Sequence, residues 1–169
     1  MNRTIILAFL LIFPILSIGQ NKTDAENISE IDSYLKLIDS TATNENESLA
    51  EGPIIYNNIF KKNKGWEAYY LVKNNFLLRV RYSDTDTNLN KDINLYFKNN
   101  ELVFAELIIT YTKGKKKNMQ PFKKRYYFFP GRLQWETKNQ NEDYEPEEYF
   151  YNSVYISNEA KKIRKLINK

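Results

Sequence analysis

The stretch Ile93–Glu106, INLYFKNNELVFAE, determines the fold that the sequence predicts. Apolar and aromatic side chains alternate with polar ones on either side of Asn99-Asn100, and this period of two is typical of strands with one buried face. Asparagine tolerates the positive φ that a two-residue hairpin turn requires. The stretch therefore predicts an antiparallel hairpin. Its facing pairs are Phe97 with Leu102 and Leu95 with Phe104.

A second hairpin is predicted over Arg125–Glu136, RYYFFPGRLQWE, because its apolar pattern repeats that of the first. Its tip is Pro130-Gly131. Proline fixes a negative φ, so this tip is a different kind of turn. The same register gives the facing pairs Phe128 with Leu133 and Tyr126 with Trp135.

The alternating pattern extends well beyond these two hairpins. Aromatic and β-branched residues recur at a period of two from Ile54 to Ile156, which predicts further strands. Another hairpin tip is expected at Asn74-Asn75, and the last strand is expected over Glu148–Ile156. The region therefore predicts a meander of seven or eight antiparallel strands.

Helical spacing flanks the strands on both sides. A helix is predicted over Asp24–Ser40, with Thr23 and Glu26 at capping-box spacing. Its apolar stripe is Ile28, Ile31, Leu35 and Ile38. A second helix is predicted after Ser157, with an apolar stripe of Ala160, Ile163, Leu166 and Ile167.

These elements predict one α+β domain over residues 20–169, with an N-terminal helix, an antiparallel meander sheet and a C-terminal helix. A single sheet with both helices on one face is the simplest layering. Curling of the sheet into a half-barrel around the first helix is the main variant. We expect the domain to be a monomer.

The first residues, MNRTIILAFLLIFPILSIGQ, have the pattern of a secretory signal peptide. Arg3 precedes an apolar run, and the small residues Ser17 and Gly19 suit cleavage before Gln20. The run is shorter than the roughly 20 residues that cross a bilayer, although an uncleaved anchor is the alternative. We therefore expect residues 1–19 to be removed and the protein to be exported, to the periplasm or outside the cell. No transmembrane span is expected in the mature chain.

The chain contains no histidine and no cysteine. Ser-His-Asp and Cys-His catalytic groups therefore cannot form, and zinc loses its preferred ligands. We assign no catalytic residue, no metal ligand and no cofactor from the sequence. These absences favour a binding or interaction protein of the cell envelope over an enzyme.

A basic stretch over Thr112–Arg125 is the first candidate binding site. It contains no acidic residue and is expected to form an exposed loop between two strands. Clustered cations attract polyanions, so an acidic glycan, the envelope surface or another protein is the expected partner. Nucleic acid is not expected for an exported protein. A solvated loop that only aids solubility is the alternative. The candidate cations are Lys113, Lys115, Lys116, Lys117, Lys123, Lys124 and Arg125.

Tyrosines of the predicted last strand are the second candidate. Tyr149, Tyr151 and Tyr155 would share one strand face, opposite Phe150, Val154 and Ile156. If that face is exposed, the rings form an amphipathic surface for a sugar or a protein. If a helix covers it, they belong to the core.

The stretch Tyr82–Ile93, YSDTDTNLNKDI, places oxygen side chains at every second position, as at the start of an EF-hand loop. The glycine expected at position six is Leu89, and the glutamate expected at position twelve is Leu95. A polar connection between two strands therefore explains the stretch better than a calcium loop does. A weak calcium site is the alternative.

A small carboxylate-dependent hydrolase acting on glycans is the alternative function. Such an enzyme needs two convergent acids, and Glu106, Glu136 and Glu67 lie within or near predicted strands. Strand alternation places each of them more simply on a solvent-facing side. An immunity or inhibitor protein against a secreted toxin would share the features of the binding protein.

The signal ending in SIGQ and the hairpins LYFKNNELVFAE and RYYFFPGRLQWE resemble small exported proteins of Bacteroidetes-type bacteria. The resemblance covers the signal and roughly Ile93–Thr137. It rests on hairpin cores, so it implies fold and compartment, and it implies no activity.

Overall fold

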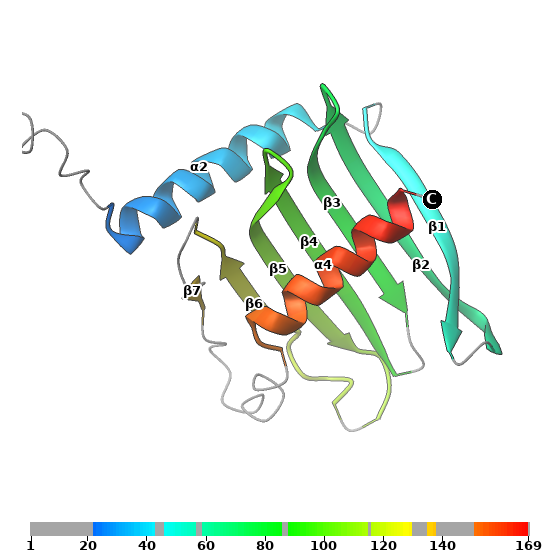
Figure 1. The fold of residues 1–169 in the computed structure, drawn as a ribbon. Coiled ribbons are helices and arrows are strands. Elements are labelled where there is room, and N and C mark those ends of the chain that lie inside the picture. The colour runs from blue at the N-terminus through cyan, green and yellow to red at the C-terminus, as the bar shows by residue number, and fades with distance from the viewer. Residues whose placement is uncertain are drawn as a thin grey trace, which may run out of the picture.

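The computed structural model describes residues 22–42, 46–56, 59–85, 88–114, 116–129, 135–137 and 151–168. The expected signal peptide, residues 1–19, lies outside these residues. Two helices flank an antiparallel sheet within them (Figure 1). In chain order the elements are α2 (Asp24–Thr41), β1 (Ser48–Tyr56), β2 (Ile59–Lys73), β3 (Phe76–Thr85), β4 (Leu89–Lys98), β5 (Glu101–Tyr111), β6 (Phe122–Tyr127), β7 (Trp135–Glu136) and α4 (Ser153–Ile167).

The sheet is a simple meander in which each strand pairs with the next along the chain. Its order runs from β1 to β7, so the first and last strands lie at opposite edges and the sheet is open. Among the described residues, six strands are long and β7 has only 2 residues. The expected antiparallel meander is therefore confirmed. Without the two-residue β7 the sheet has six strands, slightly fewer than the expected seven or eight.

Two of the expected hairpin tips are confirmed by their backbone geometry. Asn74 and Asn75 have φ of 52° and 65°, and Asn99 and Asn100 have φ of 53° and 65°. Two successive positive φ values give the turn whose twist matches that of paired strands, which is why asparagine occupies both positions. The third tip, Pro130-Gly131, lies outside the described residues.

A β-bulge in each asparagine hairpin changes the predicted register. Phe97 lies opposite Leu102, as predicted, but Tyr96 and not Leu95 lies opposite Phe104. Val103 is the extra residue, so Val103 and Phe104 both face α2. The adjacent hairpin has the same feature, because Leu71 pairs with Arg79 and Val72 pairs with Leu77, which leaves Leu78 as the extra residue. Bulges increase the local twist of a sheet, and both of these lie under α2.

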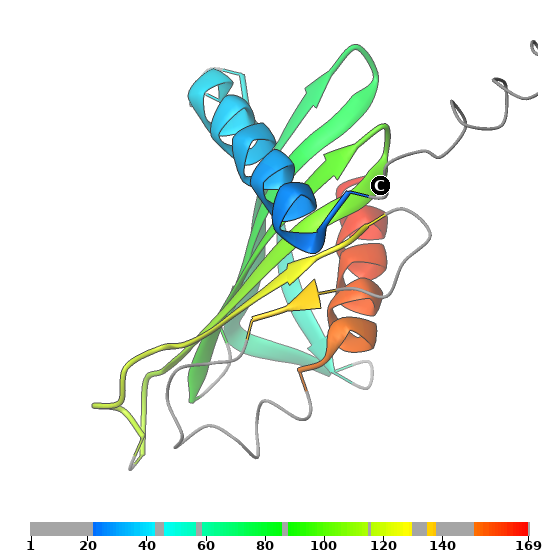
Figure 2. The ribbon, with the colours of Figure 1, turned by 90° about the vertical axis from the view of Figure 1, so that its left-hand side faces the viewer.

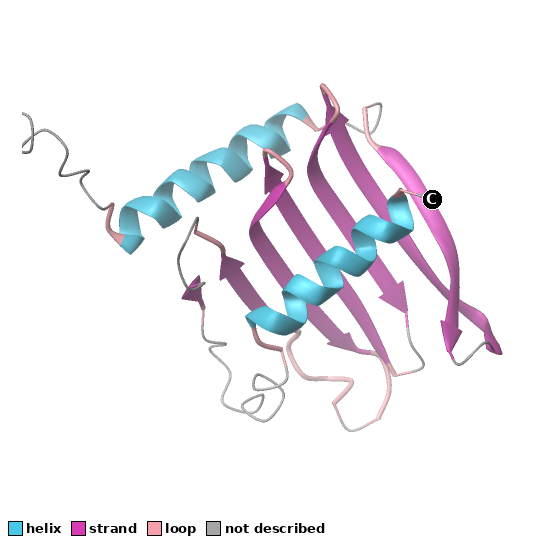
Figure 3. Ribbon diagram, viewed as in Figure 1, coloured by secondary structure: helices cyan, strands magenta, loops and turns pink. Residues whose placement is uncertain are grey.

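The two helices lie on opposite faces of the sheet, which corrects the prediction of a single covered face (Figures 1 and 2). Figure 3 shows the resulting layers, with α4 in front of the strands and α2 crossing one end of the sheet. Because side chains alternate along a strand, Leu95 and Phe97 face α4, whereas Tyr96 between them faces α2. The meander therefore contributes apolar side chains to two cores.

The larger core lies between the sheet and α4. Ile156, Ala160 and Ile163 of α4 are buried against strand residues that include Phe97 and Tyr126. Both of these rings are almost completely inaccessible to water, at 1% and 0% exposure. Burial of an aromatic side chain of this size stabilises a fold by about 2 to 3 kcal/mol.

α4 begins earlier than predicted, and this overturns the expected last strand. Ser153–Ile156 belong to the helix, and the side chain of Asn152 caps it by accepting a hydrogen bond from the Tyr155 amide at 3.0 Å. The burial of Ile156, Ala160 and Ile163 follows an i, i+4, i+7 pattern, which is helical. Tyr149, Tyr151 and Tyr155 also fit a period of two, which is why the sequence pattern favours a strand there. Residues 148–150 lie outside the described part.

The smaller core lies between α2 and the other face. The predicted helix is confirmed to within one residue, with a capping box between Thr23 and Glu26. Ile38 is buried at its C-terminal end, and Ile28, Ile31 and Leu35 pack toward the sheet.

Three tyrosine hydroxyls also connect α2 to the sheet. Tyr34 donates to the carbonyl oxygen of Phe97 at 2.5 Å. Two sheet tyrosines donate to carboxylates on the helix. Those pairs are Tyr96 with Asp39 at 2.8 Å and Tyr127 with Asp32 at 3.1 Å. Burial is the largest cause that raises the pKa of Tyr96, and the contact with Asp39 is the next. This hydroxyl therefore remains a donor at neutral pH.

The pairing of β6 with β7 differs by one residue from the prediction. Trp135 lies opposite Tyr127, and Tyr126 lies opposite Glu136. A shift of one residue exchanges the two faces of a strand. It brings Glu136 to the α4 face, where it forms an ion pair with Lys124 at 2.9 Å.

Candidate functional site

The structure separates the predicted basic residues into two groups. Lys123 and Arg125 are exposed and face the α2 side of the sheet, whereas Lys124 between them faces α4 and is only 4% exposed. Its ammonium pairs with Glu136 and lies 5.6 Å from the centre of the Tyr126 ring. The prediction of Lys124 as a binding residue is therefore wrong, because strand alternation turns it into the core.

The exposed pair contacts one carboxylate on the neighbouring strand. Arg125 Nε lies 2.9 Å from Glu106 Oε1, and Lys123 Nζ lies 3.8 Å from the same atom. Asn94 donates to the other oxygen of Glu106 at 3.3 Å. The Glu106 hydrogen bond is the main reason that the pKa of Arg125 is raised. Glu106 thus contacts both cations, and Asp32 of α2 adds a smaller electrostatic contribution to the raised pKa of Arg125.

The connection between β5 and β6 carries the other predicted cations. Lys113 and Lys117 are exposed there, and Lys116 lies 4.9 Å from the centre of the Tyr111 ring. Lys115 lies outside the described residues. The expected loop between two strands is confirmed up to Pro121, at the end of the sheet opposite α2 (Figure 1), but Phe122–Arg125 of the stretch predicted as a loop belong to β6. We call Lys113, Lys117, Lys123 and Arg125 the basic margin.

The predicted tyrosine face does not exist as a strand surface. Tyr151 precedes α4 and Tyr155 lies in its first turn, and their rings meet edge to face at 5.1 Å. Both are half-buried, and Tyr151 also packs near Phe122 in the larger core. Tyr149 lies outside the described residues. Tyr151 and Tyr155 therefore pack against the larger core from the start of the helix, and the expected strand face is wrong in both its exposed and its covered form.

The acidic stretch after Tyr82 divides between the two faces of the sheet. Asp84 pairs with Lys91 at 2.9 Å on the α4 face, whereas Asp92 accepts from Ser83 at 2.6 Å on the α2 face. These two carboxylates cannot bind one ion together. Asp86 lies outside the described residues. Within the described ranges, no group of three metal-ligating side chains is present.

Lys91 is the centre of a half-buried cluster that joins β3 and β4 to α4. It also pairs with Glu159 at 2.8 Å. Burial lowers the pKa of Lys91, but Tyr155, Asp84 and Glu159 together outweigh burial and the pKa is raised. Burial is the main cause that raises the pKa of Tyr155, to about 12. The ammonium is therefore held in its charged form and anchors the helix. It is not available as a base.

The candidate hydrolytic acids do not converge. Glu106 faces the α2 side of the sheet, whereas Glu136 faces α4, where it pairs with Lys124 and accepts from the Ser153 amide at 2.6 Å. Glu67 is exposed on β2, and the strands β3 and β4 separate it from Glu106 on β5. The pair Glu106 and Glu136 is therefore excluded as a two-acid site.

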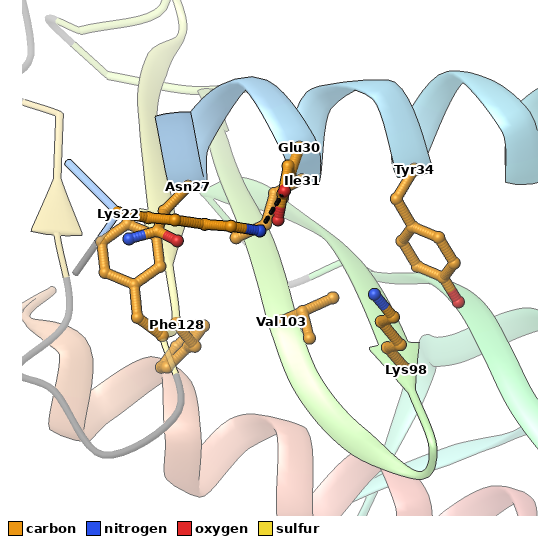
Figure 4. Close-up of a pocket in the computed structure, with 9 residues that line it drawn as sticks. Lys22, Asn27, Glu30, Ile31, Tyr34, Lys98, Val103 and Phe128 are labelled. Carbon is orange, nitrogen blue, oxygen red and sulfur yellow. Dashed lines mark hydrogen bonds and ion pairs between the residues drawn. The ribbon is translucent and has the colours of Figure 1, made fainter. Parts of the chain in front are cut away.

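A pocket that the sequence did not suggest lies between the first turns of α2 and the sheet (Figure 4). Its volume is about 280 Å³. Residues of one helix stripe form one side, and the β4–β5 hairpin with the segment after β6 forms the other. The lining residues are Lys22, Asn27, Glu30, Ile31, Tyr34, Lys98, Val103, Phe128 and Phe129.

The only sequence signal for this pocket was indirect. The helix residues from Asn27 to Tyr34 follow an i, i+3, i+4, i+7 pattern, and Lys98 stands beside a hairpin turn. Nothing in the sequence states that α2 crosses this hairpin. The pocket depends on that crossing.

Comparison of the chain with protein-family models, with curated proteins and with solved structures finds no match. In the described part of the chain, neither helix has the length and apolar character needed to cross a membrane. The function is therefore argued from geometry and charge.

Proposed function

We propose that the protein is an exported, non-enzymatic binding protein of the cell envelope and that the basic margin holds an acidic glycan. One observation carries the proposal. Four exposed cations lie along β6 and the connection that precedes it, and Glu106 is the described carboxylate that forms ion pairs with two of them. The margin therefore retains positive charge beyond its internal ion pairs.

The position of these cations supports a polymeric partner. Lys123 and Arg125 are exposed on β6, and Lys113 and Lys117 continue the charge into the adjoining connection. Exposed charges of this kind contribute to association more than to stability. A polyanion can contact several of them at once without entering a cavity.

Elution from a heparin column tests the proposal. The variant Lys113→Ser/Lys117→Ser/Lys123→Ser removes three exposed cations, and we expect it to elute at a lower salt concentration than the wild type. Direct contacts between opposite charges weaken as salt screens them, over a Debye length of about 10 Å at 0.1 M.

The matched control removes the same charge elsewhere. Lys36 on α2 and Lys161 and Lys165 on α4 are exposed, and their replacement by serine leaves the net charge equal to that of the first variant. We expect the control to remain close to the wild type. An equal shift in both variants, or a margin variant that elutes with the wild type, would exclude the margin as a specific glycan surface.

Anionic vesicles containing phosphatidylglycerol provide the second probe. We expect weak or no sedimentation with them under the salt conditions that retain the protein on heparin. Binding to the vesicles without retention on heparin would replace the glycan by the lipid surface and overturn this form of the proposal.

A further inference from the structure

The pocket beneath α2 has the composition of a site for a small amphipathic molecule. Ile31, Val103, Phe128 and Phe129 give it an apolar wall, and Phe129 is only 8% exposed. Lysine, glutamate and asparagine side chains lie at its rim (Figure 4). Ligand sites combine a largely apolar lining with a few polar groups in this way, and about 280 Å³ is near the lower end of their usual range of roughly 300–1,000 Å³.

One ammonium group at the rim, that of Lys98, forms no ion pair with a described residue. Lys22 forms an ion pair with Glu30, so these two charges compensate each other. Lys98 lies 5.9 Å from the centre of the Tyr34 ring, and no ion pair joins it to a carboxylate of the described residues. The charge at the pocket is therefore positive, and it is concentrated on Lys98.

Hydrogen bonds connect the elements that form the walls of the pocket. The Tyr34 hydroxyl donates to the Phe97 carbonyl oxygen at 2.5 Å, which joins α2 to β4. The bulge at Val103 turns that side chain toward the helix, and the Phe128 amide donates to the Val103 carbonyl oxygen at 3.0 Å. A preorganised site loses less conformational entropy when it binds.

We propose that this pocket binds a small amphipathic anion, with the apolar body against Ile31, Val103 and the two phenylalanines and the anionic group at Lys98. This inference concerns a pocket that is lined by other residues than the basic margin, so it does not depend on the glycan proposal. A short-chain carboxylate such as octanoate has the required combination of a compact apolar body and a single negative charge.

Titration of the full protein with octanoate, followed by NMR chemical shifts of backbone amides, tests the proposal. We expect saturable shifts at the first turns of α2 and in the β4–β5 hairpin. Octylammonium, which has the same chain and the opposite charge, should not produce them. Equal binding of the two ions, shifts confined to α4, or no saturable shift with octanoate would overturn the proposal.

Two lysines provide a matched pair of variants. Lys98 and Lys73 each precede an Asn-Asn turn, and both are exposed, but only Lys98 lines the pocket. We expect Lys98→Gln to weaken octanoate binding about tenfold, the low end for a hydrogen bond to a charged group, and Lys73→Gln to leave it unchanged. An unchanged affinity in Lys98→Gln, or an equal loss in both variants, would remove Lys98 from the site.

A third variant tests the cavity itself. Val103→Phe adds a ring where the bulge directs the side chain into the pocket, and we expect it to abolish octanoate binding while leaving heparin elution unchanged. Retained binding in a folded Val103→Phe protein would contradict the proposal. If this variant does not fold, the comparison of Lys98 with Lys73 still decides, because both side chains are exposed and their replacement leaves the core intact.

Discussion

Replacement of Arg79 by leucine tests how charge is buried beneath α2. The Arg79 guanidinium lies 2.5 Å from Asp39 and 2.8 Å from Glu47, and its side chain is only 8% exposed. Glu47 is 2% exposed and also pairs with Arg81, which is 45% exposed. In Arg79→Leu, the buried Glu47 carboxylate therefore retains one ion-pair partner, Arg81, which lies at the surface.

The expected loss follows from the asymmetry of buried ion pairs. Removal of one partner from such a pair costs about 3–5 kcal/mol, because the remaining charge is buried without compensation. We expect about 3 kcal/mol for Arg79→Leu, because Arg81 still contacts Glu47. For a protein of this size, each kcal/mol lowers Tm by about 2–4 °C, so the melting temperature should fall by about 6–12 °C.

Urea unfolding followed by tryptophan fluorescence measures the change, since Trp66 stacks on the Tyr82 ring of the larger core. The double variant Arg79→Leu/Glu47→Leu should recover most of the loss, because two apolar residues replace the buried charges. Arg81→Leu is the control and should cost about 0–1 kcal/mol, as an exposed partner. A loss below about 1 kcal/mol in Arg79→Leu, or additive losses in the double variant, would refute the reasoning.

Three further predictions concern separate parts of the chain. Burial alone would raise the pKa of Glu159, but Lys91 outweighs burial and lowers this pKa below the ordinary 4.5. The stabilisation that the Glu159 carboxylate gives the fold should therefore be complete above pH 4.5 and be lost as pH falls through the lowered pKa. If Glu159→Gln lost as much stability in acid as the wild type does, this would contradict the prediction. Asn75 has a φ of 65°, so Asn75→Ala should cost about 1 kcal/mol in urea unfolding while Asn75→Gly should not, and equal stability of the alanine variant would count against the turn. Lys124→Met should lower the free energy of unfolding by about 1–3 kcal/mol without changing heparin elution. Lys123→Met should instead lower the salt concentration of heparin elution and leave stability unchanged. Identical behaviour of the two variants would contradict the opposite orientations of these neighbours.

The features that the sequence predicted correctly are those with local causes. The boundaries of α2 follow from the Thr23–Glu26 capping box and the apolar stripe of the helix. The turns at Asn74-Asn75 and Asn99-Asn100 follow from the tolerance of asparagine for positive φ. Each of these signals acts within a few residues, so it can be read from a short stretch of chain.

The candidate site residues show that a local sequence pattern does not indicate which face of the fold a side chain occupies. Lys123, Lys124 and Arg125 form one basic run in the sequence, but the central lysine pairs in the core with Glu136. Tyr151 and Tyr155 fit a strand period equally well, yet they belong to the start of a helix capped by Asn152. Composition indicates that charge and aromatic rings are present, and it does not indicate which way they face.

Periodicity, capping and φ preference are properties of neighbouring residues, so the antiparallel meander, the first helix and the asparagine turns could be predicted from short stretches of sequence. Three other features emerged with the folded chain: the helices cover opposite faces, bulges at Leu78 and Val103 shift the register, and a pocket lies beneath α2. Each of these depends on which apolar surfaces meet across long stretches of chain. A strand with apolar residues on both sides can pack against either helix, and the packing of both together selects the arrangement.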